Sequence, residues 1–158
     1  MKNLHIPVLC ACITFCSLFS AAQNQQVIVN EPNYNKPRLF DNLPELIPVS
    51  IDNLNNLVHA KPGVSINTNL SSDAKTAPFE GKVVSSVSKY DDKVQTVVIK
   101  STNYIGASLY ISKVTSEDGT IKYNGRLISF QHGDLYVLQQ RDAGLVLVKK
   151  NYYDVINE

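Results

Sequence analysis

Apolar and polar positions alternate in short runs along the C-terminal third of the chain. Between residues 119 and 151, groups of turn-forming residues separate the apolar runs at nearly constant intervals: Asn124-Gly125, His132-Gly133-Asp134 and Asp142-Ala143-Gly144. Short strands spaced roughly 8–12 residues apart and separated by Gly and Asp are typical of an antiparallel meander that closes into a sandwich or a barrel. The pattern therefore predicts a mainly β fold.

The preceding part of the chain extends this meander. Residues 64–70 alternate apolar and polar side chains, and residues 79–90, 93–101 and 105–114 are rich in residues that favour strands. Asp91-Asp92, between two of these runs, predicts a hairpin turn. Together the runs predict about seven antiparallel strands, arranged as either a small barrel or a sandwich.

One short helix is expected at residues 50–60. Ser50 is a favourable N-cap, because its hydroxyl can accept a hydrogen bond from the free amides of the first turn. The apolar side chains of the segment fall at helical spacing and form one stripe: Ile51, Leu54, Leu57 and Val58. Lys61-Pro62-Gly63 ends the helix. A single helix of this kind would plug one end of a barrel or cover one face of a sheet.

Residues 23–49 form a proline-rich extended arm before the helix. Prolines remove backbone donors and keep the preceding residue extended, which disfavours a regular helix here: Pro32, Pro37, Pro44 and Pro48. Two arrangements remain open. Either Val27 and Val29 add an edge strand, or the apolar residues of 39–47 pack as an extended strap over the domain, and residues 23–36 can equally be a mobile linker. The β domain itself is placed at residues 50–158.

The N-terminus has the pattern of a secretory signal peptide. Lys2 precedes a short apolar run at residues 4–19, and Ala22 offers a small residue for cleavage, so residues 1–22 are expected to be removed. All three cysteines lie in this segment, which leaves the mature domain without cysteine. The alternatives are a permanent anchor, for which the run is short, and a lipoprotein modified at Cys12. We expect a secreted, periplasmic or cell-envelope protein that contacts a membrane only if Cys12 is lipidated.

Charge and motif content exclude several classes of activity. The chain has 15 basic and 14 acidic residues, interspersed along the sequence, whereas a nucleic-acid-binding protein normally presents a basic face. Beyond the signal peptide, His59 and His132 are the remaining histidines, and they lack the close spacing of a zinc site. The sequence contains no nucleophile elbow and no phosphate-binding glycine loop. We therefore expect no catalytic residue, metal or cofactor, and a domain that is not an enzyme.

The remaining polar residues are expected to have structural roles. Arg126, within a predicted strand, is expected to form an ion pair with an acidic side chain of a neighbouring strand. The tyrosines suit either strands or a binding surface. Acidic residues in turn-like segments are expected to be solvated: Asp91, Asp92, Glu117, Asp118, Asp134 and Asp142.

Several short segments together resemble a known module. Residues 79–84 (FEGKVV), 99–107, 125–129 (GRLIS), 132–134 (HGD) and 151–154 (NYYD) are similar to the N-terminal pro-segment module of secreted bacterial metallopeptidases, and less closely to the small secreted protease inhibitors called potempins. The resemblance covers residues 39–158. It implies a free-standing domain that docks onto a peptidase cleft, although the sequence stops at Glu158, where a protease domain would follow in the pro-segment family.

The hypothesis implied by this resemblance is an inhibitor or partner of a secreted metallopeptidase. A rigid domain that presents an extended loop loses little entropy on binding. Asp73 would bring a carboxylate to the partner's catalytic metal, and the proline-rich arm is a second candidate that would lie along a cleft as an added strand. Two other classes stay open: a module that binds glycan or a surface protein, and a structural subunit of the cell envelope. The candidate partner-binding loop comprises Ser71, Ser72, Asp73, Ala74, Lys75 and Thr76.

Overall fold

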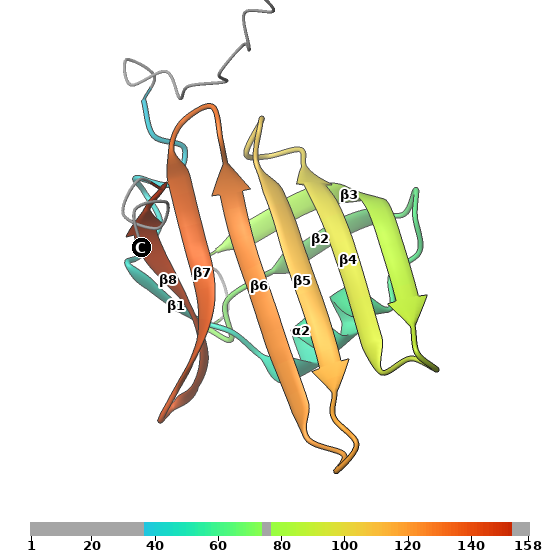
Figure 1. The fold of residues 1–158 in the computed structure, drawn as a ribbon. Helices are drawn as coiled ribbons and strands as arrows, with labels where there is room; N and C mark the ends of the chain where they lie inside the picture. The colour runs from blue at the N-terminus through green and yellow to red at the C-terminus, as the bar shows by residue number, and fades with distance from the viewer. Residues whose placement is uncertain (1–36, 74–76, 153–158) are drawn as a thin grey trace, which may run out of the picture.

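Eight antiparallel strands and one short helix make up the part of the chain that the structure, a computed structural model, describes: residues 37–73 and 77–152. The strands form one sheet in the order β1-β8-β7-β6-β5-β4-β3-β2, which curls into a half-barrel (Figure 1). The predicted mainly β meander with one short helix is confirmed. The elements are β1 (Leu46–Pro48), α2 (Ile51–Val58), β2 (Ser65–Asn69), β3 (Pro78–Lys89), β4 (Val94–Ser101), β5 (Ser108–Thr115), β6 (Ile121–Ser129), β7 (Asp134–Arg141) and β8 (Gly144–Asn151).

The two edges of the sheet meet at one end of the half-barrel. Val49, after β1, forms an isolated antiparallel bridge with Ser71, after β2. The amide of Ser72 donates to the carbonyl oxygen of Pro48 over 2.8 Å, and the amide of Val49 donates to that of Leu145 over 2.8 Å. Open edge strands expose backbone groups that can pair with another chain. These contacts therefore protect one end of each edge.

The core lies on the concave side of the sheet. Successive side chains of a strand point to opposite faces, so alternate residues of the long strands enter this core. β3 approaches β4 so closely at Gly81 that an added Cβ atom would lie 2.7 Å from the carbonyl oxygen of Lys100. The largest fully buried side chains are Phe40, Ile47, Phe79, Val83, Val97, Ile99, Leu109, Ile111, Leu127 and Tyr136.

The helix α2 lies inside the curl and contacts β4 and β5 (Figure 1). Leu54, Leu57 and Val58 are buried as the predicted stripe requires. Ile51, the first residue of the helix, is not buried and is 58% exposed. Ser50 occupies the N-cap position but makes no side-chain capping hydrogen bond; only its carbonyl oxygen takes part, accepting from the Leu54 amide over 3.2 Å. The capping prediction for its hydroxyl is thus wrong. No helix among the described residues is long and apolar enough to cross a membrane.

The described part of the proline-rich arm packs against the sheet. Phe40 is fully buried, with its ring centroid 5.5 Å from that of Tyr104 and 5.6 Å from that of Tyr136. The Tyr136 hydroxyl donates to the carbonyl oxygen of Pro44 over 2.5 Å. Residues 37–45 therefore form the expected strap, and β1 continues it as a strand paired with β8. That added strand brings the sheet to eight strands instead of about seven. The turn predicted at Asn124-Gly125 is wrong, because both residues lie inside β6 and pair with β5. The domain division expected at residue 50 falls inside the sheet.

Other expectations fall on residues that the structure does not describe. The signal peptide, the lipidation of Cys12 and the edge strand at Val27 and Val29 all lie within residues 1–36, outside the described residues.

Most of the turn acids lie where the sequence predicted. The chain turns between β3 and β4 through residues with positive φ, including Asp91 (51°) and Asp92 (64°). Asp118 is fully exposed, and its pKa is lowered because its carboxylate accepts the amide of Thr120 over 2.9 Å. Asp134 is the exception, because it is only 2% exposed and accepts the amide of Leu39 over 2.6 Å. The prediction of a solvated turn at Asp134 is wrong: the strap covers that turn and needs an acceptor there.

Candidate functional site

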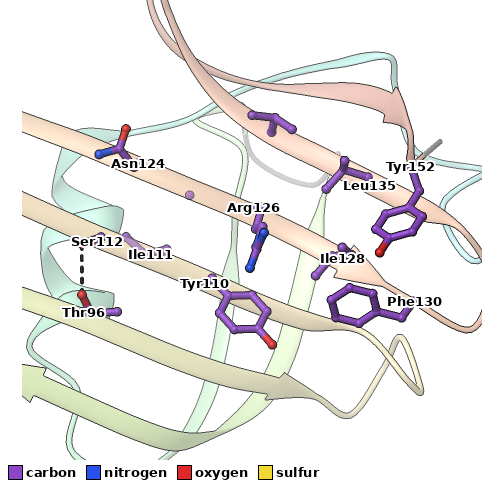
Figure 2. A pocket seen from close by; sticks show the side chains of 12 residues that line it. Thr96, Tyr110, Ile111, Ser112, Asn124, Arg126, Ile128, Phe130, Leu135 and Tyr152 are labelled. Atoms are coloured by element: carbon purple, nitrogen blue, oxygen red, sulfur yellow. Dashed lines mark hydrogen bonds between the residues drawn. The ribbon is translucent and has the colours of Figure 1, made fainter. Parts of the chain in front are cut away.

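A groove of about 520 Å³ crosses the convex face of the sheet over β4 to β7, and we call it the outer groove (Figure 2). Neighbouring strands bring its polar residues into register, because Thr96 lies opposite Ser112, Ser112 opposite Asn124, and Tyr110 opposite Arg126. Residues directly opposite each other on paired strands share one face of the sheet. The outer groove is lined by Thr96, Tyr110, Ile111, Ser112, Asn124, Gly125, Arg126, Ile128, Phe130, Leu135, Val137 and Tyr152.

One end of the outer groove is an apolar hollow. Ile128 and Leu135 pair across β6 and β7 and are only 2% and 3% exposed, although they stand on the outer face. The rings of Phe130 and Tyr152 form an edge-to-face pair beside them, with centroids 5.6 Å apart. Phe130 remains 42% exposed. The hollow therefore combines a well-packed apolar floor with an aromatic wall that a partner can reach.

Arg126 supplies positive charge next to this hollow. Its guanidinium carbon lies 5.0 Å from the centre of the Tyr110 ring, a cation–π contact that follows from their cross-strand pairing. Within residues 37–73 and 77–152, no carboxylate forms an ion pair with Arg126. The predicted ion pair with an acid on a neighbouring strand is therefore wrong, because the residue opposite Arg126 on β5 is Tyr110 and that on β7 is Val137. An exposed guanidinium held by an aromatic ring is suited to binding an anion.

At the polar edge of the outer groove, the hydroxyl groups of Thr96 and Ser112 form hydrogen bonds within the domain. The hydroxyls of Thr96 and Ser112 lie 3.0 Å apart and share a hydrogen bond, drawn in Figure 2. The Ser112 hydroxyl also lies 3.4 Å from the carbonyl oxygen of Gln95, which it can donate to. Asn124 is exposed and Arg126 points along the groove toward Tyr110 (Figure 2). The lining residues thus offer a binding surface with apolar, aromatic and cationic contacts.

His132 lies near two residues that together resemble a catalytic triad in composition. The Ser129 hydroxyl is 2.8 Å from the His132 Nδ1 atom, and the charge of His132 acts on the nearby Asp134. Ser129 is fully buried, however, and Asp134 accepts the Leu39 amide. A hydroxyl without access to solvent cannot attack a substrate, so these contacts stabilise the β6–β7 turn. Among the described residues, no group of three or more His, Cys, Asp or Glu side chains could hold a metal ion.

The predicted partner-binding residues lie elsewhere, after β2. Ser71 is buried in the bridge that joins the sheet edges, whereas Ser72 and Asp73 are exposed. The Asp73 amide donates to the Ser71 hydroxyl over 3.1 Å. Ala74, Lys75 and Thr76 lie outside the described residues. None of the described three lines the outer groove.

Sequence reasoning did not find the outer groove. Alternation along each strand predicts that Tyr110 and Ser112, or Asn124 and Arg126, share a face. It does not say which residues of different strands stand side by side. Comparisons with protein-family models, with curated proteins and with solved structures found no match to this chain.

Proposed function

We propose that the domain is a non-catalytic binding module that holds a segment of a protein partner in the outer groove. The segment presents a carboxylate to Arg126 and places an aliphatic or aromatic side chain in the adjacent hollow. The observation that carries this proposal is the exposed Arg126 guanidinium, stacked on Tyr110 and without a carboxylate partner in the described part of the chain.

The geometry favours such a partner for two physical reasons. Stacking on Tyr110 holds the Arg126 guanidinium in place before binding, so less side-chain entropy is lost when a carboxylate arrives. A hydrogen bond to a charged group typically contributes about 1.5–3 kcal/mol. The apolar hollow adds burial of a neighbouring side chain at roughly 25 cal/mol per Å². Charge fixes the orientation of the segment, and the hollow supplies much of the affinity.

The same geometry disfavours a glycan. A sugar presents hydroxyl groups around its ring, and each of them needs a hydrogen-bond partner once it leaves water. The hydroxyls of Thr96 and Ser112, which line the outer groove, already bond to each other and so offer less to a sugar. The buried floor formed by Ile128 and Leu135 offers no hydrogen bond to a sugar.

Substitution Arg126→Gln tests the proposal. Peptides selected from a displayed random library on the wild-type domain are expected to carry Asp or Glu beside a large apolar residue. They should bind R126Q at least tenfold more weakly, which corresponds to about 1.4 kcal/mol. Affinity is measured by fluorescence anisotropy at two salt concentrations, because an exposed ion pair weakens as salt rises.

Lys82→Gln is the matched control, since Lys82 is an exposed cation on β3 outside the outer groove. K82Q should bind the selected peptides as the wild type does. Selected peptides without acidic residues, or equal affinities for R126Q and K82Q, would refute the carboxylate role of Arg126. Binding to a glycan array with loss in R126Q would replace the protein partner by a sugar.

Inhibition of a secreted metallopeptidase by the loop after β2 is a second candidate, and the contacts of Asn69 favour it. The Asn69 side-chain oxygen accepts the amides of Ser71 and Ala77, over 3.1 and 3.2 Å, on the two sides of this loop. Its side-chain nitrogen lies 3.5 Å from the carbonyl oxygen of Asp73. One amide group thus fixes both ends of the loop, and a loop with fixed ends loses less entropy when it enters a cleft.

Asn69→Ala is expected to weaken inhibition by at least tenfold, if the loop is inhibitory, and to cost about 1–3 kcal/mol of stability by leaving two amides unpaired. Inhibition constants of the full chain would be measured against a panel of secreted bacterial metallopeptidases. Asn69→Asp keeps an acceptor for both amides, so it should inhibit more strongly than N69A. Full peptidase activity across the panel with micromolar wild-type protein would count against this second candidate.

A further inference from the structure

Strands β6 and β7 part halfway along their length. Their ladder runs from Ser129↔Asp134 to Arg126↔Val137 and ends there. Beyond that point β6 continues paired with β5 as far as Ile121, and β7 continues paired with β8 as far as Arg141. Figure 1 shows the lower halves of the two strands diverging. We call the opening between them the split.

Backbone groups of both strands are directed into the split. At the β5–β6 turn the Ser116 amide donates to the Thr120 carbonyl oxygen over 2.9 Å, and hydrogen-bonded pairs alternate with non-bonded pairs along an antiparallel ladder. Lys122 and Asn124 therefore bond to β5, whereas Ile121 and Tyr123 direct their backbone groups away from β5. The ladder of β7 with β8 directs the backbone of Gln140 toward β6 in the same way.

The split is roomy and mostly apolar. It has a volume of about 570 Å³ and is lined by residues of β6, β7, β8 and the start of α2. Leu138 and Leu145, which are 8% and 7% exposed, form its floor. Two exposed apolar side chains stand at its rim: Ile51 at the start of α2 and Ile121 at the start of β6, 58% and 49% exposed. These two isoleucines extend the apolar lining of the split to its mouth.

We propose that the split accepts an extended apolar segment of a partner protein, which adds to the free edge of β6 at residues 121–123 as a further strand. A small apolar ligand would fill the space but offer no partner to the backbone groups of Ile121 and Tyr123, which the described strands leave unpaired. An added strand satisfies them and places alternate side chains over Leu138 and Leu145, so backbone pairing supplies affinity and the apolar floor supplies specificity. This proposal is independent of Arg126, which does not line the split.

The residues that line the split also indicate which side chains the partner segment should carry. Thr120, Lys122 and Gln140 contribute polar groups, while Tyr123 contributes an aromatic ring. Burial, and secondarily the charge of Asp52, raises the pKa of the Tyr123 hydroxyl, which agrees with a ring held between β6 and the start of α2. A segment with apolar residues at every second position and polar residues between them matches this environment, because alternate side chains of a strand point to opposite faces.

The test uses four labelled octapeptides that alternate threonine with valine, leucine, isoleucine or phenylalanine, each titrated against the full chain by fluorescence anisotropy. At least one is expected to bind, with slower hydrogen exchange at the amides of Ile121 and Tyr123. The same peptide with N-methyl groups on alternate amides should bind at least tenfold more weakly, because strand addition needs its backbone donors. Equal affinity for the methylated peptide would show an apolar pocket without strand pairing and overturn the proposal.

Ile121→Pro removes one of the amides directed into the split without touching the ladder to β5, and proline is tolerated at the first residue of a strand. I121P should bind the peptide at least tenfold more weakly. Ser65→Pro is the matched control, because Ser65 is the exposed first residue of edge strand β2. S65P should bind as the wild type does. No binding of any of the four peptides at millimolar concentration, or a concentration-dependent dimer with protected amides at Ile121 and Tyr123, would also overturn the proposal.

Discussion

Replacing Tyr136 by alanine is expected to lower the free energy of unfolding by about 3–5 kcal/mol, the range for loss of a large buried aromatic side chain. Tyr136 is fully buried, and its ring lies 5.6 Å from that of Phe40. Its hydroxyl donates to Pro44, 92 positions earlier in the chain. The substitution therefore removes core volume and also releases the strap formed by residues 37–45.

The matched variant Tyr136→Phe separates these contributions. It keeps the ring but leaves the Pro44 carbonyl oxygen without its donor, at a cost of about 1–3 kcal/mol. Unfolding in urea is followed by far-ultraviolet circular dichroism, since the chain contains no tryptophan for fluorescence. Equal loss in Y136A and Y136F would mean that the ring contributes nothing, and no loss in Y136F would mean that the hydrogen bond does not anchor the strap.

Replacing Asp134 by alanine is expected to cost about 1–3 kcal/mol at neutral pH, because the Leu39 amide loses its acceptor. Asp134→Asn keeps an acceptor oxygen and removes the charge, so its stability at neutral pH should lie much closer to that of the wild type. The comparison tests whether the carboxylate serves the strap as an acceptor or as a charge. Urea unfolding of both variants at pH 7 measures it, and equal losses would contradict the acceptor role.

The pH dependence of Asp134 has a defined sign. Burial raises its pKa above 3.8, while the Leu39 amide, Arg38 and His132 oppose the shift and Asp41 adds to it. Protonation therefore favours the folded state. As pH falls through the raised folded pKa, the wild type should gain stability relative to D134N, and the gain should be complete below 3.8. A wild type that loses stability relative to D134N over this range would show that the folded pKa is lowered.

The two proposed binding surfaces rest on different features of one sheet. The outer groove depends on side chains that stand opposite each other on paired strands, above all Arg126 and Tyr110. The split depends on backbone groups that lose their partner where β6 leaves β7. Their tests are separable, because Arg126→Gln alters a side chain on the convex face and Ile121→Pro alters an amide at the start of β6. Failure of either proposal leaves the other standing.

Local patterns in the sequence determined the class of the fold. Alternation in period two specifies strands, and the left-handed turn at Asp91 and Asp92 joins β3 to β4 where the sequence placed a hairpin. The helical spacing of Leu54, Leu57 and Val58 specified the buried face of α2. These features depend on residues within a few positions of one another, so local sequence is sufficient to predict them.

Only the tertiary structure decided which distant residues meet. The sequence around Asp134 is typical of a turn. Asp134 is nevertheless buried, because the strap packs over it and the amide of Leu39, 95 positions earlier, donates to its carboxylate. The sequence predicted an ion pair for Arg126, yet the order of the strands places Tyr110 and Val137 opposite it. The parting of β6 from β7 likewise follows from how the whole sheet curls. Such contacts depend on strand order and curvature, which arise from packing the entire core, and a pattern along the chain does not encode them locally.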